Sequence, residues 1–358
     1  MPSQFKPHRI AIVTDAWHPQ VNGVVRTLLN TASQLRRMGV QVEIVSPALF
    51  KTIPCPSYPE IRLAITTARR VERCIAEIKP DALHIATEGP LGWAARRAAI
   101  RQGWGFTTAY HTRFPEYVNA RIGIPVSWLY RLFQAFHRPS SAVLVPTETL
   151  MKELDARGFG NLTYWTRGVS HDIFFPRCPQ QSPNPVSPIF IYVGRLAVEK
   201  NIEAFLELDL PGVKWVAGEG PLGDELRRRY PDVRWTGVLS QPDLAELYSR
   251  ADVFVFPSKT DTFGLVMVEA MACGLPVAAY PVVGPIDVIG DSGAGALDPD
   301  LRQACLSALK IPRVKAISHA QTFTWELATQ QFYDSLVPLR SQLEAQERQS
   351  ESLTPLTR

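Results

Sequence analysis

Features that would assign this chain to several familiar classes are scarce or missing. The five cysteines are odd in number, form no Cys-x-x-Cys pair and have no histidine cluster nearby, which argues against a disulfide framework and a structural zinc site. No run of about eighteen apolar residues predicts a membrane-spanning helix, and the first residues lack the apolar segment of a signal peptide. We therefore expect reduced thiols and a cytoplasmic protein.

Composition and charge set the next limits. The 358 residues suit two domains, and 46% hydrophobic with 20% charged residues is ordinary for a globular protein. The net charge of +4 conceals an asymmetry: residues 1–172 carry 21 Lys and Arg against 12 Asp and Glu, whereas residues 173–358 carry 17 against 22. A basic first half could face nucleic acid, an anionic membrane or a phosphorylated acceptor, and of these we expect the membrane and no nucleic acid.

Short apolar runs alternate with amphipathic stretches in the first half, which is typical of βαβ units around a parallel sheet. We expect strands over residues 9–14, 41–46, 82–86, 106–110, 142–145 and 162–165, and helices over 24–38, 68–78, 91–101, 125–136 and 147–157. Residues 176–188 then contain five prolines. Because proline fits neither a helix interior nor a central strand, this segment is predicted to be a linker.

The same alternation restarts after the linker, with strands expected over residues 189–193, 213–217, 233–236, 253–256 and 277–279. Two Rossmann-like domains facing each other across a cleft fit this pattern, because open α/β sheets bind ligands at the carboxyl ends of their strands. Residues 323–346 are helical in pattern. The predicted division is 1–175 for the first domain, 176–188 for the linker, 189–320 for the second domain, 321–346 for the C-terminal helix and 347–358 for a disordered tail.

The most informative motif occupies residues 258–274. Asp261 precedes Glu269 by eight residues, and a buried strand is expected just before them. A helix that starts between the two acids would direct its free N–H groups and the positive end of its dipole at a ligand above the strand. This predicts a pocket for an anion flanked by hydroxyl groups. The alternative is that Asp261 only caps the helix and that Glu269 lies on the surface.

The spacing of these acids resembles the acid-x7-acid signature of retaining nucleotide-sugar glycosyltransferases with the GT-B fold, in particular glycosyltransferase family 4. The resemblance implies two Rossmann-like domains and a C-terminal helix that crosses back to the first. It also implies that Asp261 holds the transferred sugar and that Glu269 takes the ribose hydroxyls. Its other donor-binding positions here are Phe263, Gly264 and Leu265. The family usually has Glu at the first acid, so the shorter Asp261 leaves the sugar open.

Cationic residues precede this motif. Arg195 and Lys200 follow Gly194 and a predicted strand, five residues apart. A leaving nucleoside diphosphate carries negative charge that, without a metal, must be met by Arg, Lys and helix N–H groups. The pattern resembles the diphosphate site of the family, which assigns both cations and Gly194 to the donor. Two solvated charges at the start of a helix are the alternative.

The resemblance implies donor contacts elsewhere as well. Gly23 and Val24 stand where the family has a loop that closes over the diphosphate, and a helix N-terminus there would favour phosphate. Backbone groups of Val238 and Leu239 would recognise the base. His111, at the end of a predicted strand, resembles the histidine of the HTxFxxY segment of lipid-directed members, where it lies near the reacting sugar.

A second glycine motif allows another interpretation. Residues 218–223 fit Gly-x-Gly-x-x-Gly between a predicted strand and a helix, so a nicotinamide-dependent dehydrogenase is an alternative. The acid expected about twenty residues later is missing, because residues 236–240 read Thr-Gly-Val-Leu-Ser. We interpret these glycines as tight turns.

The mechanism implied by the resemblance is retention by same-face attack, in which the leaving diphosphate accepts the proton of the acceptor. Neither a general base nor a carboxylate nucleophile can be nominated in the first half of the chain. The residues expected to act in catalysis are His111, Arg195, Lys200 and Asp261. We recognise no metal-ligand cluster, so we expect neither a metal nor another cofactor.

An amphipathic helix expected around residues 125–136 suggests how the acceptor is reached. The candidates for a membrane or acceptor surface are Trp128, Leu129, Leu132, Phe133, Phe136, Arg96 and Arg97. Apolar residues with Trp and Arg could seat a monotopic enzyme on anionic lipid. The alternative is that the aromatics pack in the core and the arginines are solvated.

The resemblance covers nearly the whole chain and points to the branch of glycolipid synthases and mannosyltransferases. We expect transfer of a hexose or hexuronic acid from a UDP-sugar to diacylglycerol at the cytoplasmic face of a bacterial membrane. GDP-mannose-dependent α-mannosylation of a lipid or polysaccharide intermediate is the second hypothesis. A nucleotide-sugar-binding protein without activity is a third, which the presence of Arg195, Lys200 and Glu269 disfavours.

Overall fold

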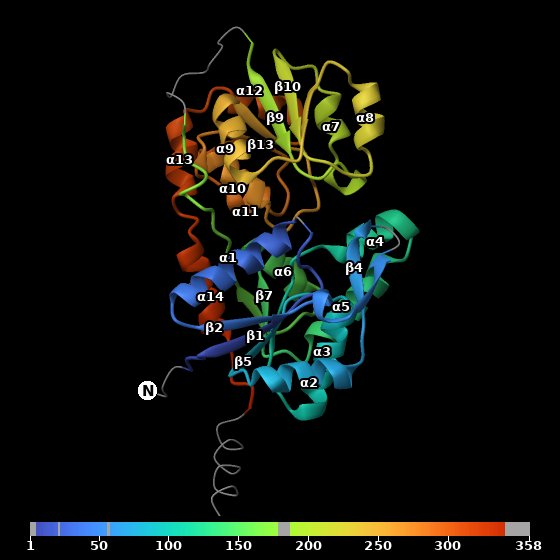
Figure 1. The fold of residues 1–358 in the computed structure, drawn as a ribbon. Coiled ribbons are helices and arrows are strands. Elements are labelled where there is room, and N and C mark those ends of the chain that lie inside the picture. The colour runs from blue at the N-terminus through green and yellow to red at the C-terminus, as the bar shows by residue number, and fades with distance from the viewer. Residues whose placement is uncertain (1–4, 21, 56–57, 178–186, 341–358) are drawn as a thin grey trace, which may run out of the picture.

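The computed structural model describes residues 5–20, 22–55, 58–177 and 187–340. Two α/β domains are stacked one on the other, and the chain returns at its end to the domain in which it began (Figure 1). Most of the predicted linker and all of the predicted tail lie outside the described residues. None of the described helices is long and apolar enough to cross a membrane.

The first domain is built on a six-stranded parallel sheet in the order β2-β1-β5-β6-β7-β8. Its strands are β1 (Arg9–Val13), β2 (Gln41–Val45), β5 (Ala82–Ile85), β6 (Thr107–Ala109), β7 (Ala142–Val145) and β8 (Leu162–Tyr164). Its helices are α1 (Gly23–Arg37), α2 (Ala68–Ile78), α3 (Pro90–Gln102), α4 (Phe114–Ile122), α5 (Val126–His137) and α6 (Glu148–Ala156). The central strands are almost fully buried, as helices on both faces require.

The second domain repeats this plan with the sheet order β11-β10-β9-β12-β13-β14. Its strands are β9 (Ile189–Val193), β10 (Val213–Ala217), β11 (Arg234–Gly237), β12 (Val253–Phe256), β13 (Val277–Ala279) and β14 (Gly295–Leu297). Its helices are η2 (Val198–Lys200), α7 (Glu203–Leu206), α8 (Gly223–Arg229), α9 (Gln241–Arg250), α10 (Leu265–Ala272), α11 (Pro285–Val288), α12 (Leu301–Ala308) and α13 (Arg313–Ala320). The prediction of two Rossmann-like domains is confirmed.

The sequence patterns missed several short elements. A 3₁₀ turn, η1 (Pro47–Leu49), leads into an antiparallel hairpin of β3 (Lys51–Cys55) and β4 (Tyr58–Ile65). This hairpin forms a sheet of its own beside the first domain, and Pro54 within β3 argued against a strand there. Helix α4 and strand β14 were also missed, because both are short and lack a clear period.

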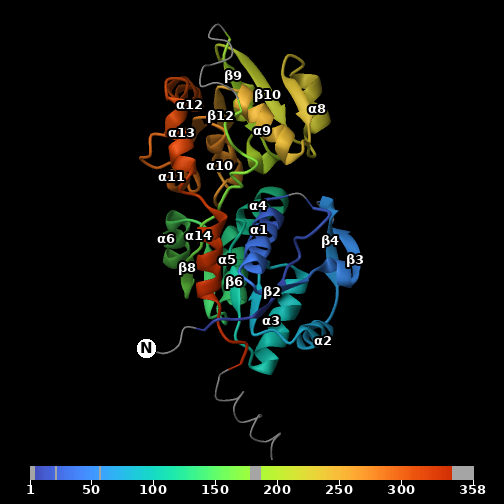
Figure 2. The ribbon, with the colours of Figure 1, turned by 60° about the vertical axis from the view of Figure 1, so that its left-hand side comes forward.

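The last helix, α14 (Trp325–Ser335), packs against the first domain beside α1 (Figure 2). Phe332 is fully buried there, with its ring centroid 5.1 Å from that of Trp165 and 4.9 Å from that of His84. The indole N–H of Trp165 donates to the Ala328 carbonyl at 2.9 Å. This helix therefore completes the core of a domain whose other elements lie more than 150 residues earlier.

The prediction of a helix over residues 323–346 was too long. Helix α14 ends at Ser335, and Leu336 already has an extended backbone. Pro338 explains the end, because proline lacks an N–H and disfavours the helical conformation of the residue before it. Beyond it the chain runs as a strap, with the Leu339 N–H donating to the Asp81 carbonyl at 2.7 Å. Residues 341–346 lie outside the described part.

We predict that Phe332→Ala destabilises the first domain by about 3–5 kcal/mol, because it leaves a cavity under a buried aromatic cluster. The free energy of unfolding, followed in denaturant by near-UV circular dichroism, measures the effect. Leu327→Ala, on the same helix at a half-exposed position, is the control and should cost far less. Equal effects of the two substitutions would contradict the role assigned to α14.

Candidate functional site

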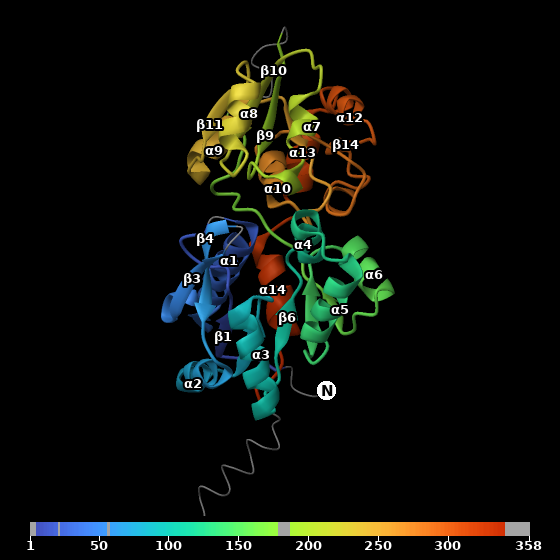
Figure 3. The ribbon, with the colours of Figure 1, turned by 90° about the vertical axis from the view of Figure 1, so that its right-hand side faces the viewer.

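The loops that follow the carboxyl ends of the strands in both sheets meet where the domains face each other (Figure 3). In the second domain, the loop after β9 and the loop between β12 and α10 bring Lys200 and Asp261 together, with Nζ 2.5 Å from Oδ1. Burial alone would lower the pKa of Lys200, but Asp261, together with Tyr117 and Tyr192, outweighs burial, and the pKa is raised. The lysine is therefore a permanent cation at the cleft, next to the acid predicted to hold the sugar.

A tyrosine from the opposite domain borders this ion pair. Burial raises the pKa of Tyr117, on α4, with Asp261 acting in the same direction and Lys200 against it. Arg195 is half-buried in the same loop as Lys200, and its carbonyl accepts a hydrogen bond of 2.8 Å from the Tyr192 hydroxyl. Lys200 and the predicted sugar acid are thus neighbours, and Arg195 belongs to the same loop as Lys200. Sequence reasoning assigned no role to Tyr117.

Helix α10 begins at the cleft as predicted. Gly264 precedes it with a positive φ of 85°, and a Cβ there would lie 2.7 Å from Met267 Cε and 2.9 Å from the Phe256 ring, so only glycine fits. Phe263 is buried and packs on Phe323, which leaves its backbone as the group able to meet a ligand. Leu265 opens the helix at the domain boundary.

Helix α1 begins directly across from α10. A Cβ on Gly23 would lie 3.7 Å from Leu265 Cδ1, so the two helix starts approach each other closely. Asn22 caps α1 by accepting from the Val25 N–H at 3.0 Å. Gly23 is exposed and Val24 is partly buried. The predicted donor contacts from the first domain therefore lie opposite those of the second.

The second acid is not a surface residue. Glu269 is buried on α10, and its Oε1 lies 2.6 Å from Nη1 of Arg26 on α1. Arg26 reaches it from the other domain. Burial raises the pKa of Glu269, and the nearby Arg26 lowers it. The surface alternative for Glu269 is excluded, and Arg26 is a cleft residue that sequence reasoning missed.

His111 lies two residues after the end of β6, where it meets the loop of the second domain that carries Thr262. Thr262 donates from its hydroxyl to the His111 carbonyl at 2.6 Å. In the ring, Nδ1 lies 3.3 Å from the Arg167 guanidinium, and Nε2 is buried without a hydrogen-bond partner among the described residues. Burial first, and then the charge of Arg167, lower the pKa of His111 well below its usual value.

These contacts define what His111 can do. A neutral imidazole that accepts at Nδ1 carries its hydrogen on Nε2, so the unpartnered atom is a donor. Arg167 is fixed in turn by donating to the Trp165 and Thr166 carbonyls at 2.5 and 2.9 Å. The site thus offers one neutral N–H donor, suited to a sugar hydroxyl. Arg167 had no signal in the sequence, because its partner lies 56 residues away.

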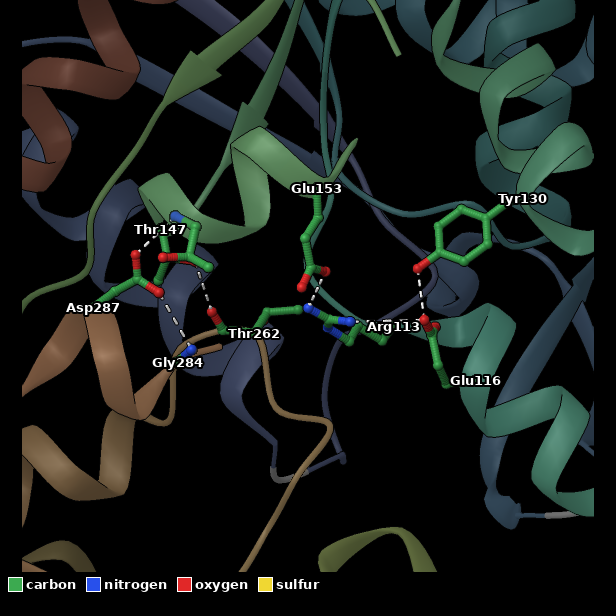
Figure 4. A network of polar contacts seen from close by, with 9 residues as sticks. Arg113, Glu116, Tyr130, Thr147, Glu153, Thr262, Gly284 and Asp287 are labelled. Atoms are coloured by element: carbon green, nitrogen blue, oxygen red, sulfur yellow. Dashed lines mark hydrogen bonds and ion pairs between the residues drawn. The ribbon is translucent and has the colours of Figure 1, made fainter. Parts of the chain in front are cut away.

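Further polar contacts join the domains around this point (Figure 4). Asp287 of α11 accepts from the Thr149 N–H at 2.8 Å and so caps α6 of the first domain. The Thr147 hydroxyl donates to the Thr262 carbonyl at 3.4 Å. Nearby, Arg113 Nη2 lies 2.5 Å from a carboxylate oxygen of Glu153. Asp287 and Thr262 of the second domain thus contact Thr149 and Thr147 of the first.

Two carboxylates of the first domain that lie near the cleft have structural partners. Asp15 is buried and accepts from the N–H groups of Leu91 and Gly92 at 2.9 and 3.1 Å. Glu88 lies 3.2 Å from Nε2 of His137. Burial is the main cause of the raised pKa of Asp15, which those backbone bonds oppose. Asp15 therefore holds the start of α3 in place, and Glu88 holds the end of α5.

The glycines of the second motif are packing positions. A Cβ on Gly218 would lie 2.0 Å from the Gly194 carbonyl oxygen, and one on Gly220 would lie 2.4 Å from that of Leu196. These glycines let the turn after β10 pack against the loop that carries Arg195. Val238 is exposed and Leu239 partly buried beside it, at the edge where a base could lie.

The sequence does contain one DxD motif, Asp298-Pro299-Asp300, although no metal-ligand motif was predicted from it. The Asp300 carboxylate caps α12 by accepting from the Arg302 N–H at 2.9 Å, while its own N–H donates to Asp298 at 2.8 Å. Within the described ranges, no group of three or more His, Cys, Asp or Glu side chains is arranged to hold a metal.

Comparison with known proteins identifies the family. A model described as Glycosyltransferase Family 4 matches residues 21–173, and one described as Glycosyl transferases group 1 matches residues 187–310. A GDP-mannose-dependent alpha-mannosyltransferase of Mycobacterium tuberculosis is 30% identical over 321 residues, covering 81% of this chain and 84% of the relative. The chain belongs to glycosyltransferase family 4.

Other relatives show the range of this glycosyltransferase family. Sulfoquinovosyl transferase SQD2 of Arabidopsis thaliana is 31% identical over 326 residues, covering 82% of this chain and 63% of the relative. Alpha-monoglucosyldiacylglycerol synthase of Streptococcus pneumoniae is 25% identical over 348 residues, covering 84% and 78%. In fold, sucrose-phosphate synthase from Thermosynechococcus elongatus matches with a TM-score of 0.69 at 20% identity, covering 97% and 100%. The predicted GT-B fold and enzyme class are confirmed, and the dehydrogenase and the inactive binder are set aside.

We predict that Lys200→Met lowers the turnover of the glycosyltransferase by about 100-fold or more, because a leaving group would lose one charge-stabilising donor. Initial rates with a nucleotide-sugar donor measure the loss, and circular dichroism checks folding. Lys259→Met, an exposed lysine of the loop that carries Asp261, removes the same charge and should change the rate little. A folded, fully active Lys200→Met variant would refute the role of Lys200.

Proposed function

We propose that this family 4 enzyme moves a hexosyl or hexuronosyl group from a UDP-sugar to diacylglycerol, with retention of configuration and without a metal. The observation that carries the proposal is the ion pair of Lys200 and Asp261, on a loop whose next residue, Thr262, donates to the His111 carbonyl of the opposite domain. A cation for the diphosphate, an acid for the sugar and a neutral N–H for a sugar hydroxyl are the groups that such a transfer needs.

The proposed reaction assigns each group a task. Arg195 and Lys200 stabilise the charge that develops on the departing diphosphate, helped by the N–H groups at the start of α10. Asp261 accepts hydrogen bonds from the sugar while Lys200 keeps it oriented. The His111 Nε2–H donates to a sugar hydroxyl. The acceptor hydroxyl attacks from the face that the diphosphate leaves, and the diphosphate takes its proton.

The lipid acceptor rests on relatives and on the surface of the first domain. One relative is named as acting in alpha-monoglucosyldiacylglycerol synthesis. Helix α5 exposes Trp128 and Leu132, at 68% and 50% of their surface. Exposed apolar residues of this kind, together with the exposed Arg97 of α3, suit the surface of an anionic bilayer.

Other residues of the predicted membrane surface lie elsewhere. Leu129 and Phe136 are buried in the core of the first domain, as the alternative interpretation held, and Phe133 is half-buried. Arg96 donates to the Phe136 and Ala135 carbonyls at 2.9 and 2.7 Å, so it binds the C-terminal end of α5. The membrane surface that we propose is therefore narrower than the sequence suggested.

GDP-mannose-dependent transfer is the second candidate, and the mycobacterial relative favours it. The test incubates the protein with UDP- and GDP-sugars, with and without diacylglycerol vesicles and in the presence of a chelator. Released nucleoside diphosphate and chloroform-soluble glycolipid are followed. Release from a UDP-sugar that rises with vesicles and yields glycolipid supports the proposal. If GDP-mannose is the only donor that is turned over, the mannosyltransferase alternative is favoured. Loss of turnover in the presence of the chelator contradicts the proposal that no metal is needed.

We predict that replacing both Trp128 and Leu132 with Ser weakens binding to anionic vesicles by about tenfold or more, since each side chain would contribute roughly 1.5–3 kcal/mol when buried in lipid. Vesicle cosedimentation measures it. The control replaces Val314 and Leu327, two half-exposed aliphatic residues on α13 and α14, with Ser. Equal binding by the two double variants would contradict the proposed membrane surface.

A further inference from the structure

The ion pair of Arg26 and Glu269 lies in the cleft, but the proposed reaction gives it no role. It joins α1 of the first domain to α10 of the second, across 243 residues of sequence, with 2.6 Å between Nη1 and Oε1. The side chain of Glu269 is 7% exposed and that of Arg26 is 22% exposed. An ion pair exposed on the surface would contribute little to the stability of the protein. This pair instead holds in place a carboxylate that is almost inaccessible to water.

Only one of the two oxygens of the Glu269 carboxylate has a hydrogen-bond partner among the described residues. Oε1 meets Arg26, whereas Oε2 is buried and accepts no hydrogen bond within the described part of the chain. A carboxylate can accept several hydrogen bonds, and a buried unsatisfied oxygen is costly. The acid lines a small cavity between the domains together with Arg26, Leu265 and Gln241. The unused oxygen therefore suits a hydroxyl group of a bound molecule.

Arg26 controls the state of this acid. Burial raises the pKa of Glu269 and the adjacent guanidinium lowers it again. Without the guanidinium, the desolvated carboxyl would hold its proton to a higher pH, and a protonated carboxyl is a weaker acceptor for a hydroxyl. The arginine comes from the opposite domain, so it can favour the ionised form of Glu269 only when the two domains are in contact.

We propose that Arg26 is a positioning residue of the ribose subsite, which is thereby shared between the two domains. Arg26 anchors one oxygen of Glu269 and favours the ionised form of the acid, so that the other oxygen is presented to a ribose hydroxyl of the donor. The inference rests on the proposed function and on the role that the family resemblance implies for Glu269, which is to take the ribose hydroxyls of the donor. It adds that nucleotide affinity depends on a residue of the first domain that does not touch the phosphate.

The test measures binding of UDP and GDP by calorimetry and continues with whichever binds more tightly and with its 2′,3′-dideoxy form. Arg26→Met should weaken binding of the ordinary nucleotide by about tenfold, the loss of one charge-assisted interaction, and binding of the dideoxy nucleotide by much less. The loss should be larger at pH 6 than at pH 8.5. Arg26→Lys should restore part of the affinity. Arg37→Met, an exposed arginine of the same helix, is the control.

A double-mutant cycle tests whether Arg26 affects nucleotide binding through Glu269. If Arg26 acts through the acid, Arg26→Met should add little loss to Glu269→Gln. Equal losses for the ordinary and dideoxy nucleotides, or wild-type affinity in Arg26→Met, would overturn the role of Arg26 and leave the proposed function standing. Absence of binding of both UDP and GDP by the wild-type protein and the Arg37→Met control would overturn the proposed function as well.

Discussion

Contact between the two domains is the constraint on which the candidate site depends. Arg26 with Glu269, Thr262 with the His111 carbonyl, and Asp287 with the Thr149 N–H each join one domain to the other. In every case, a group of one domain satisfies or orients a group of the other. The contacts between the domains therefore involve residues of the candidate site, and that site is composed of residues from both domains.

Burial explains how the charged groups are used. Asp261, Glu269 and His111 lie where water is scarce, and each has a cationic neighbour, Lys200, Arg26 or Arg167. A charge so placed is stable only when paired, because desolvation is expensive. In the structure the cations compensate the acids, and one of them fixes the tautomer of the histidine. The cleft thus stays polar enough for a nucleotide-sugar while the surrounding core remains apolar.

Much of this could be predicted from local sequence, and the remainder could not for a physical reason. Buried parallel strands such as β9 and β12 are continuous apolar runs, and Asp261, Glu269 and Lys200 stand in short motifs with fixed spacing. Arg26 and Arg167 gain their roles from partners brought near by folding, which no local pattern records. The burial of Leu129 and Phe136 likewise depends on what packs against α5, since an amphipathic helix shows the same period on a core and on a membrane.

The return of the chain to its first domain has a consequence for how the protein is made. The core around Trp165 stays open until α14 has been synthesised, because Phe332 and the strap to Leu339 come last. During translation, the first domain must therefore wait on the ribosome with an aromatic cavity exposed while the second domain folds ahead of it. The two crossings between the domains run side by side, with Val169 bridged to Thr324, so both connections are made at one place.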